Sequence, residues 1–261
     1  MRAPSPWSPW GAQVHRGDLT DLESLRSGAA AADGVIHTGF VHDFSKFAEN
    51  CEIDKRAIEV FGSALEGSER PLLVTSGLTT TAAGRLATEE DAPLAASASY
   101  PRASEATATK LLKRGVRASV VRLPQVHDRA RQGLVTFAIG IALEKGVCPY
   151  VGDGQNRWPS AHILDTARLY RLALEKAEPG ASYHAVAEEG VSFRDITEVL
   201  GRQLKLPVRS ISPDEAKDHF GWLAMFAGLD APASSALTRQ RLRWQPTERG
   251  MIADLEELQD S

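Results

Sequence analysis

This sequence of 261 residues has few cysteines, a small net charge and no long apolar runs. The two cysteines, Cys51 and Cys148, lie far apart and form no Cys-x-x-Cys pair, which argues against a structural metal and favours a reducing compartment. With 30 basic and 34 acidic side chains the formal net charge is −4, so no strong field steers the chain to nucleic acid or anionic lipid. The longest apolar runs fall well short of about 18 residues, so we expect no membrane span.

The first residues also lack the apolar core of a secretory signal. Residues 1–11 carry prolines and tryptophans without helical or strand periodicity, which predicts a poorly ordered tail. A cytoplasmic protein is therefore expected. The hydrophobic fraction of 43% is ordinary for a globular protein and is enough for one large domain, or for one domain with a smaller lobe.

Short apolar segments alternate with segments of helical periodicity through the first 150 residues. Each apolar segment ends at a glycine or a proline, and each helical segment has apolar residues three or four positions apart. This alternation predicts an α/β protein with a parallel sheet and helices on both faces. The predicted strands are 12–16, 34–38, 71–76 and 118–123, and the predicted helices lie near 19–25, 44–65, 102–114 and 134–145.

The second part of the sequence is more helical. It has one strand candidate at 181–186, a helix capped by Ser192, and a capping box with proline at the first helical position in Ser212–Glu215. We therefore expect a first domain over 12–150 and a smaller, more helical lobe over 151–261, with the two parts interleaved. The loop between the predicted strand and helix at 77–101 is long, as functional loops often are.

Binding chemistry is concentrated in residues 152–170. A Gly-Asp-Gly turn at 152–154 precedes Asn156, Arg157 and Trp158, which offer an amide, a fork of donors and a flat apolar face. His162 follows, and Asp165 is the predicted N-cap of the next helix. Each residue also has a structural interpretation: His162 as a core histidine, Trp158 as packing between lobes, and Asp165 as a cap alone.

Ligands of open α/β sheets bind beyond the carboxyl ends of the strands, and here those ends share a pattern. Asp18-Leu19, Thr38-Gly39-Phe40, Ser76-Gly77 and Leu123–His127 occur in order, followed by the turn at 152–154 and the tryptophan and proline of 242–246. This series resembles the extended or atypical short-chain dehydrogenase/reductases, the NAD-dependent epimerase/dehydratase family. The resemblance implies an incomplete Rossmann-like doubly wound parallel sheet with a smaller substrate lobe.

The resemblance also implies a role for each matching residue. Ser76 takes the position of an active-site serine or threonine that hydrogen-bonds a substrate oxygen, and no metal is implied. NAD or NADP is the implied cofactor. The implied cofactor-binding residues are Asp18, Leu19, Thr38, Gly39, Phe40, Leu123 and Pro124, and the implied substrate-binding residues are His127, Asn156, Arg157, Trp158 and His162.

Two departures from the family pattern bear on activity. The Gly-x-x-Gly-x-x-Gly turn that holds the pyrophosphate is absent, so we expect the chain to enter the fold without its first strand-helix units and 12–16 to lie loosely or beside 34–38. Tyr-x-x-x-Lys is absent too: Pro101 stands at the tyrosine and Glu105 at the lysine, whose positive charge favours proton transfer. Tyr100, one residue away, is the alternative candidate for the catalytic acid.

The leading hypothesis is an NAD(P)-dependent oxidoreductase or epimerase/dehydratase-like protein acting on a small carbonyl, hydroxyl or sugar-like substrate. The rival hypotheses are a non-catalytic NAD(P)-binding or regulatory protein of the same fold and an incomplete, inactive chain. A serine hydrolase is disfavoured because residues 74–78 do not form Gly-x-Ser-x-Gly. A small-molecule substrate is the expected partner, and a homodimer stays open.

Overall fold

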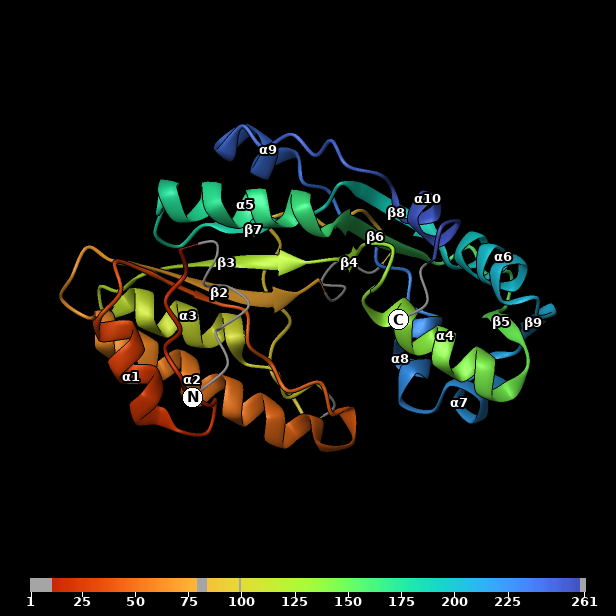
Figure 1. Cartoon of the computed structure of the whole chain (residues 1–261), viewed down its shortest axis with the longest axis horizontal. Helices are drawn as coiled ribbons and strands as arrows, with labels where there is room; N and C mark the ends of the chain where they lie inside the picture. The colour runs from red at the N-terminus through yellow and green to blue at the C-terminus, as the bar shows by residue number, and fades with distance from the viewer. Residues whose placement is uncertain (1–10, 79–83, 99, 259–261) are drawn as a thin grey trace.

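The central sheet has four parallel strands in one layer (Figure 1). A computed structural model describes residues 11–78, 84–98 and 100–258 of the chain. In spatial order the strands are β1 (Val35–His37), β2 (Pro71–Gly77), β3 (Arg117–Leu123) and β7 (Ser182–His184). The middle positions of β2 and β3 are all buried, and each strand has a short apolar run at its centre, as strands covered on both faces do.

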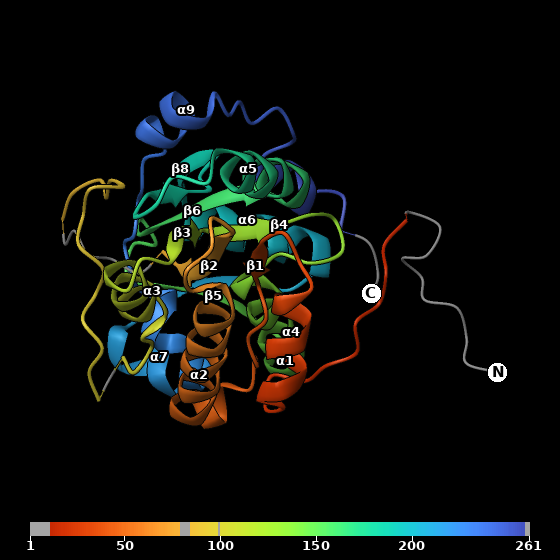
Figure 2. The ribbon, with the colours of Figure 1, turned by 90° about the vertical axis from the view of Figure 1, so that its left-hand side faces the viewer.

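Helices cover both faces of this sheet, and Figures 1 and 2 show the two layers. Side chains alternate along a strand, so Leu72 packs into one core cluster and Leu73 into the other. The predicted α/β fold with a parallel, doubly covered sheet is confirmed. One face carries α1 (Leu22–Ala30), α2 (Phe47–Leu65) and α3 (Ser104–Lys113), and the other carries α5 (Ile163–Lys176) and α9 (Ala236–Leu242).

A second lobe lies beyond the carboxyl ends of the central strands (Figure 1). Its strands are β4 (Gln125–His127), β6 (Arg157–His162) and β8 (Glu188–Ser192) in one sheet, with β5 (Cys148–Val151) paired to β9 (Val208–Ile211). Its helices are α4 (Leu134–Lys145), α6 (Phe193–Leu204), α7 (Pro213–Phe220), α8 (Ala224–Ala227) and α10 (Met251–Leu255). Two 3-10 turns, η2 (Phe44–Lys46) and η3 (Gly221–Leu223), complete the elements used below. None of the helices in the described ranges is long and apolar enough to cross a membrane.

The lobe has its own core, and the predicted helix caps position it. Ser192 accepts from the Asp195 N–H at the start of α6, and Ser212 and Glu215 form the predicted capping box of α7. Although α4 ends at residue 145 and β5 begins at residue 148, their buried side chains pack in this core with Phe193 and Leu223. The chain thus crosses to the second lobe before residue 150 and returns to the central sheet at β7.

Two local predictions are wrong. Residues 12–16 form no strand, and the His15 ring instead lies against α1, with Nε2 2.8 Å from the Ser24 carbonyl oxygen. Asp165 is not the N-cap of α5: His162 is, since its Nδ1 accepts from the Leu164 N–H at 3.2 Å. The predicted tail at 1–11 falls almost wholly outside the described residues, as do positions 79–83 and 99 of the predicted loop.

Asp165 anchors the C-terminal segment instead of capping its own helix. Its carboxylate is buried and accepts from the N–H groups of Thr247 and Glu248, both at 3.0 Å. The Trp244 indole donates to the Asp165 carbonyl oxygen at 2.9 Å. The residues that resembled the family's late tryptophan-proline motif therefore pack on α5 and help to cover the sheet.

Candidate functional site

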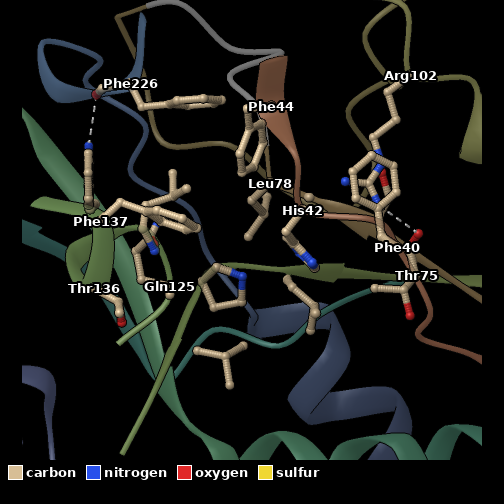
Figure 3. Close-up of a pocket in the computed structure, with 18 of the residues that line it drawn as sticks. Phe40, His42, Phe44, Thr75, Leu78, Arg102, Gln125, Thr136, Phe137 and Phe226 are labelled. Atoms are coloured by element: carbon tan, nitrogen blue, oxygen red, sulfur yellow. Dashed lines mark hydrogen bonds between the residues drawn. The ribbon is translucent and has the colours of Figure 1, made fainter. Parts of the chain in front are cut away.

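A cavity of about 800 Å³ lies where the carboxyl ends of β1, β2 and β3 meet the second lobe. Residues 37–40 follow from β1, residues 75–78 from β2 and residues 123–126 from β3. Phe137, Trp158 and Phe226 close it from the second lobe (Figure 3). This is the edge at which parallel α/β sheets bind ligands, because the loops that follow adjacent strands converge there.

Aromatic rings form the wall between the two lobes. Phe44 stacks on Trp222 with ring centroids 4.1 Å apart and planes 10° apart, and Phe137 meets Trp222 edge-on at 5.1 Å. Phe44 belongs to η2, whereas its partners belong to η3 and α4. These contacts therefore join the lobes across the cavity, and they leave its lining mostly apolar.

Both predicted catalytic residues line this cavity. Ser76 is buried near the end of β2, and Tyr100 lies shortly before α3 with its ring 6.4 Å from that of Phe47. Ser76 and Tyr100 are 24 residues apart in the sequence. They line the same cavity because the end of β2 and the segment before α3 both lie at this edge of the sheet. A hydroxyl and a phenol there provide a hydrogen-bond donor and a proton-transfer group for a substrate oxygen. Their catalytic roles stay predictions.

Arg102 is a half-buried cationic residue that lines the cavity, and sequence reasoning missed it. Its guanidinium lies 4.6 Å from the centre of the Phe40 ring, Nε donates to Ser104 Oγ at 3.1 Å and Nη2 donates to the Thr75 carbonyl oxygen at 3.4 Å (Figure 3). Ring, hydroxyl and carbonyl together hold the side chain in one orientation. The signal in the sequence was an arginine two positions after Tyr100.

Glu105, which stands at the family's lysine position, does not line the cavity. Its carboxylate pairs with the buried Arg122 of β3, at 2.8 Å from Nη2. Nη1 of Arg122 in turn lies 3.2 Å from Nε2 of the buried His184. The acidic residue therefore belongs to a structural network between α3, β3 and β7, and it brings no negative charge into the cavity.

A second buried hydrogen-bond network lies at the cavity and joins β1, α2 and α3. His37 Nε2 lies 2.8 Å from Asp54 Oδ1, and Ser104 Oγ donates to Asp54 Oδ2 at 2.6 Å. Both carboxylate oxygens are therefore engaged. Because Ser104 also accepts from Arg102, the network runs from β1 through α2 to the guanidinium. Sequence reasoning missed these residues too, although His37 occupies a strand end.

The residues predicted to bind the cofactor divide into two groups. Asp18 and Leu19 lie outside the cavity lining: the Asp18 carboxylate accepts from Thr20 at 2.6 and 2.8 Å, which lowers its pKa. Leu19 packs beside Gly39, where an added Cβ would lie 3.2 Å from Leu19 Cδ2. The residues that line the cavity are Thr38, Gly39, Phe40, Leu123 and Pro124.

Of the residues predicted to bind substrate, only Trp158 lines the cavity. Its indole donates to the Phe226 carbonyl oxygen at 3.2 Å, drawn as a dashed line in Figure 3. Asn156 donates to the carbonyl oxygens of Ala227 and Leu229, so it holds the loop that forms part of the cavity wall. It acts behind that wall rather than in the cavity.

Arg157, His127 and His162 likewise have partners away from the cavity. Arg157 binds Asp230 through Nε at 3.0 Å and Nη2 at 2.9 Å. The rings of His127 and His162 meet edge-on at 5.7 Å beside Asp254 of α10. Contact of these three residues with substrate stays a prediction, and the geometry gives each of them a structural role.

Protonation of His127 is expected to destabilise the fold. Its Nδ1 lies 2.8 Å from Asp254 Oδ2, and its Nε2 is buried without a hydrogen-bond partner among the described residues. Burial lowers the pKa of His127 from its ordinary value, and this outweighs the raising effect of Asp254. A depressed folded-state pKa means that the unfolded chain binds the proton more tightly, so stability falls as pH falls below about 6.5.

Urea unfolding measured at about pH 7.5 and about pH 5.5 checks this expectation. Burial also lowers the pKa of His184, which acts in the same direction. The free energy of unfolding should be smaller at the lower pH, and His127→Gln should reduce the difference without removing it. Equal stability at both pH values would show that neither ring resists protonation.

The fold is that of a Rossmann-like α/β protein, and the cavity lies at the carboxyl edge of its central sheet. The model of the NAD dependent epimerase/dehydratase family matches residues 2–187, and the chain belongs to that family. An uncharacterized protein of Schizosaccharomyces pombe is 45% identical over 249 residues, covering 94% of this chain and 83% of that protein. An uncharacterized protein of Saccharomyces cerevisiae is 43% identical over 245 residues, covering 94% and 82%.

Solved structures with similar folds include two sugar-nucleotide enzymes. The dTDP-glucose 4,6-dehydratase DesIV of Streptomyces venezuelae, crystallised with NAD and TYD, has a TM-score of 0.72 at 18% identity, covering 92% of this chain and 76% of that one. The UDP-glucose 4-epimerase of Thermus thermophilus, in complex with NAD, has a TM-score of 0.71 at 17% identity, covering 94% and 83%. Because the identities are this low, the likeness to these structures establishes the fold alone.

The described residues fit the nicotinamide end of a dinucleotide. Gly39 exposes its backbone to the cavity, Phe40 and Pro124 offer flat apolar surfaces, and Ser76 adds a hydroxyl. A pyrophosphate fits less well: α1 has Asp21 at its N-cap and Glu23 in its first turn, which disfavour an anion there. The described residues therefore suit the nicotinamide end better than they suit a pyrophosphate at the start of α1.

Proposed function

We propose that the protein is an NAD(P)-dependent oxidoreductase, or an epimerase/dehydratase-like enzyme, that acts on a small carbonyl or hydroxyl substrate. The observation that carries this proposal is the shared cavity of Ser76 and Tyr100 beyond the carboxyl ends of β1–β3. Membership of the NAD-dependent epimerase/dehydratase family supports it. So does the cavity volume of about 800 Å³, which is large enough for a nicotinamide ring and a small substrate together.

Each residue of this chain has a defined task in the proposal. The Ser76 hydroxyl donates a hydrogen bond to the substrate oxygen and holds it beside Tyr100. The Tyr100 phenol then gives its proton to that oxygen during reduction and becomes a phenolate, and the phenolate takes the proton during oxidation. Bound NAD(P) supplies hydride chemistry. Aromatic side chains such as Phe44 and Phe137 exclude water, which strengthens the polar contacts inside.

Two groups of side chains hold the ligands in place. The backbone at 38–40, the Phe40 ring, Leu123 and Pro124 would hold the nicotinamide end of a bound cofactor. Trp158 and the loop after α8 face the substrate, and Asn156 and Arg157 fix that loop through the hydrogen bonds described above. Substitution of Asn156 or Arg157 should therefore change KM more than it changes kcat.

The test is turnover by the full chain. Consumption of NADH or NADPH is followed by absorbance with a panel of ketones and aldehydes, and cofactor binding is followed by fluorescence. Conversion of sugar nucleotides is followed by chromatography, because an epimerase or dehydratase returns its cofactor unchanged. Sustained turnover with any member supports the enzyme and excludes the non-catalytic rival of the same fold. Cofactor binding without turnover across the panel would favour that rival, and the absence of binding at millimolar cofactor would oppose both.

A further inference from the structure

The side chains that line the cavity carry more positive than negative charge. Among the described lining residues the carboxylate is that of Asp54, and the guanidinium groups are those of Arg102 and Arg131. Both oxygens of Asp54 are already engaged with His37 and Ser104, as described above. Arg131 is exposed, whereas Arg102 is half-buried and fixed against Phe40. The guanidinium of Arg102 therefore faces the cavity without a carboxylate partner.

One nitrogen of Arg102 has unused hydrogen-bonding capacity. Nε and Nη2 have acceptors, but Nη1 makes no hydrogen bond within the described part of the chain. Nη1 lies near the end of β2, since a Cβ added to Gly77 would be 4.0 Å from it, with no nearer contact among the described residues outside the neighbouring positions. The absence of a side chain at Gly77 thus leaves open space beside a fixed donor, next to Ser76.

A guanidinium in such a place selects for a negatively charged oxygen. Its planar fork matches carboxylate and phosphate groups, and hydrogen bonds to a charged acceptor are about twice as strong as neutral ones. The contacts with Phe40, Ser104 and Thr75 fix the orientation beforehand, so little side-chain freedom is lost when an anion binds. The surrounding rings favour an apolar body for the rest of that ligand.

We propose that Arg102 binds an oxyanion of the ligand beside Ser76, and that the substrate is an acid with an apolar or aromatic body. The inference rests on the proposed function in placing the reaction in this cavity. A carboxylate on the substrate and a phosphate of the cofactor share the required chemistry. The experiment below distinguishes these two sources.

Isothermal titration of the full chain measures the preference directly, without turnover. The probes are benzoylformate, its neutral methyl ester, and inorganic pyrophosphate. Wild type should bind benzoylformate at least about tenfold more tightly than the ester. Arg102→Gln should weaken benzoylformate binding by about 10- to 100-fold and leave the ester unchanged, because a hydrogen bond to a charged group is lost.

Two further variants control for position and for folding. Arg114→Gln removes an exposed arginine that pairs with Glu66 at the end of α3, and it should retain the wild-type preference. Arg102→Lys keeps the charge but loses the planar fork, and it should show an intermediate loss if Arg102→Gln does not fold. Thermal unfolding of each variant confirms that a folded protein is being titrated.

The outcomes separate the inference from the proposed reaction. Loss confined to benzoylformate identifies a substrate carboxylate, and loss confined to pyrophosphate identifies a cofactor phosphate. An acid preference without turnover would support the anion site and oppose the proposed reaction. Equal affinity for acid and ester, no binding of either anion, or loss caused by Arg131→Gln in place of Arg102→Gln would overturn the assignment.

Discussion

The variant Glu105→Lys, which restores the family's lysine, is expected to unfold far more readily than wild type and to gain no activity. Glu105 is paired with Arg122, whose side chain is only 4% exposed and which also contacts His184. A lysine would replace the attraction with repulsion beside a buried guanidinium. Removing one partner of a buried ion pair costs about 3–5 kcal/mol, so a loss of at least that size is expected.

Chemical denaturation of Glu105→Lys and Glu105→Gln checks this prediction. Glutamine keeps one acceptor for Arg122 without the charge, so its loss of stability should be smaller. Wild-type stability in the lysine variant, or a gain in turnover, would show that residue 105 faces the cavity and that the observed pairing with Arg122 is wrong. The comparison also separates the effect of charge from the effect of side-chain size.

Ser76→Ala is expected to lower turnover by about 100- to 1,000-fold while leaving the fold intact, because one positioned donor to the reacting oxygen is removed. The change deletes a single oxygen from a side chain at the cavity surface, so it creates little new void. Cofactor binding should be nearly unchanged, since the hydroxyl acts on the substrate. The loss should appear mainly in kcat.

Ser119→Ala is the matched control for this prediction. Ser119 is also a buried strand serine, on the neighbouring β3, but it does not line the cavity. Its alanine variant should retain turnover. If Ser76→Ala and Ser119→Ala have equal activity, Ser76 is a structural residue at a strand end, which is the simpler interpretation of a serine in that position.

Most of the central sheet could be predicted from local patterns. The strand at 71–77 contains an apolar run and ends at glycine, and the strand at 117–123 ends before Pro124. The helix at 193–204 has clear periodicity and a Ser192 cap, and the helix at 134–145 ends at Gly146. Residues 12–16 have a strand-like pattern but form no strand. Strand formation depends on a neighbouring strand with free hydrogen-bonding groups, and local sequence does not report that neighbour.

Cavity residues at the ends of predicted strands could be found from the sequence. Cavity residues that are placed by tertiary contacts could not. Ser76 and the segment 38–40 follow from the position of the strand ends. The pairing of His37 with Asp54 joins β1 to α2, and Arg102 faces the cavity only because Phe40 and Ser104 hold it there. No spacing in the sequence encodes such a contact.

The segment 152–170 shows that polar residue types do not reveal which partner a side chain has. Its polar residues indicated a substrate-binding loop, yet most of them bind other parts of the protein: Asn156 and Arg157 hold the 227–231 loop, and Asp165 holds the C-terminal segment. A side chain that holds a loop and one that holds a ligand use the same donors and acceptors. Sequence alone does not distinguish the two roles.

The measurement that tests the central claim most directly is an NADH titration of wild type and Gly77→Leu. Gly77 lines the cavity at the end of β2, and an added Cβ would meet nothing nearer than Arg102 Nη1 at 4.0 Å. A leucine side chain at this position should extend into the cavity on the side of Arg102. We expect NADH to bind wild type and to bind Gly77→Leu at least about tenfold more weakly, which corresponds to a loss of about 1.4 kcal/mol of binding free energy. The two proteins should have similar melting temperatures. Equal NADH affinity in the two folded proteins would contradict the assignment of this cavity as the ligand site.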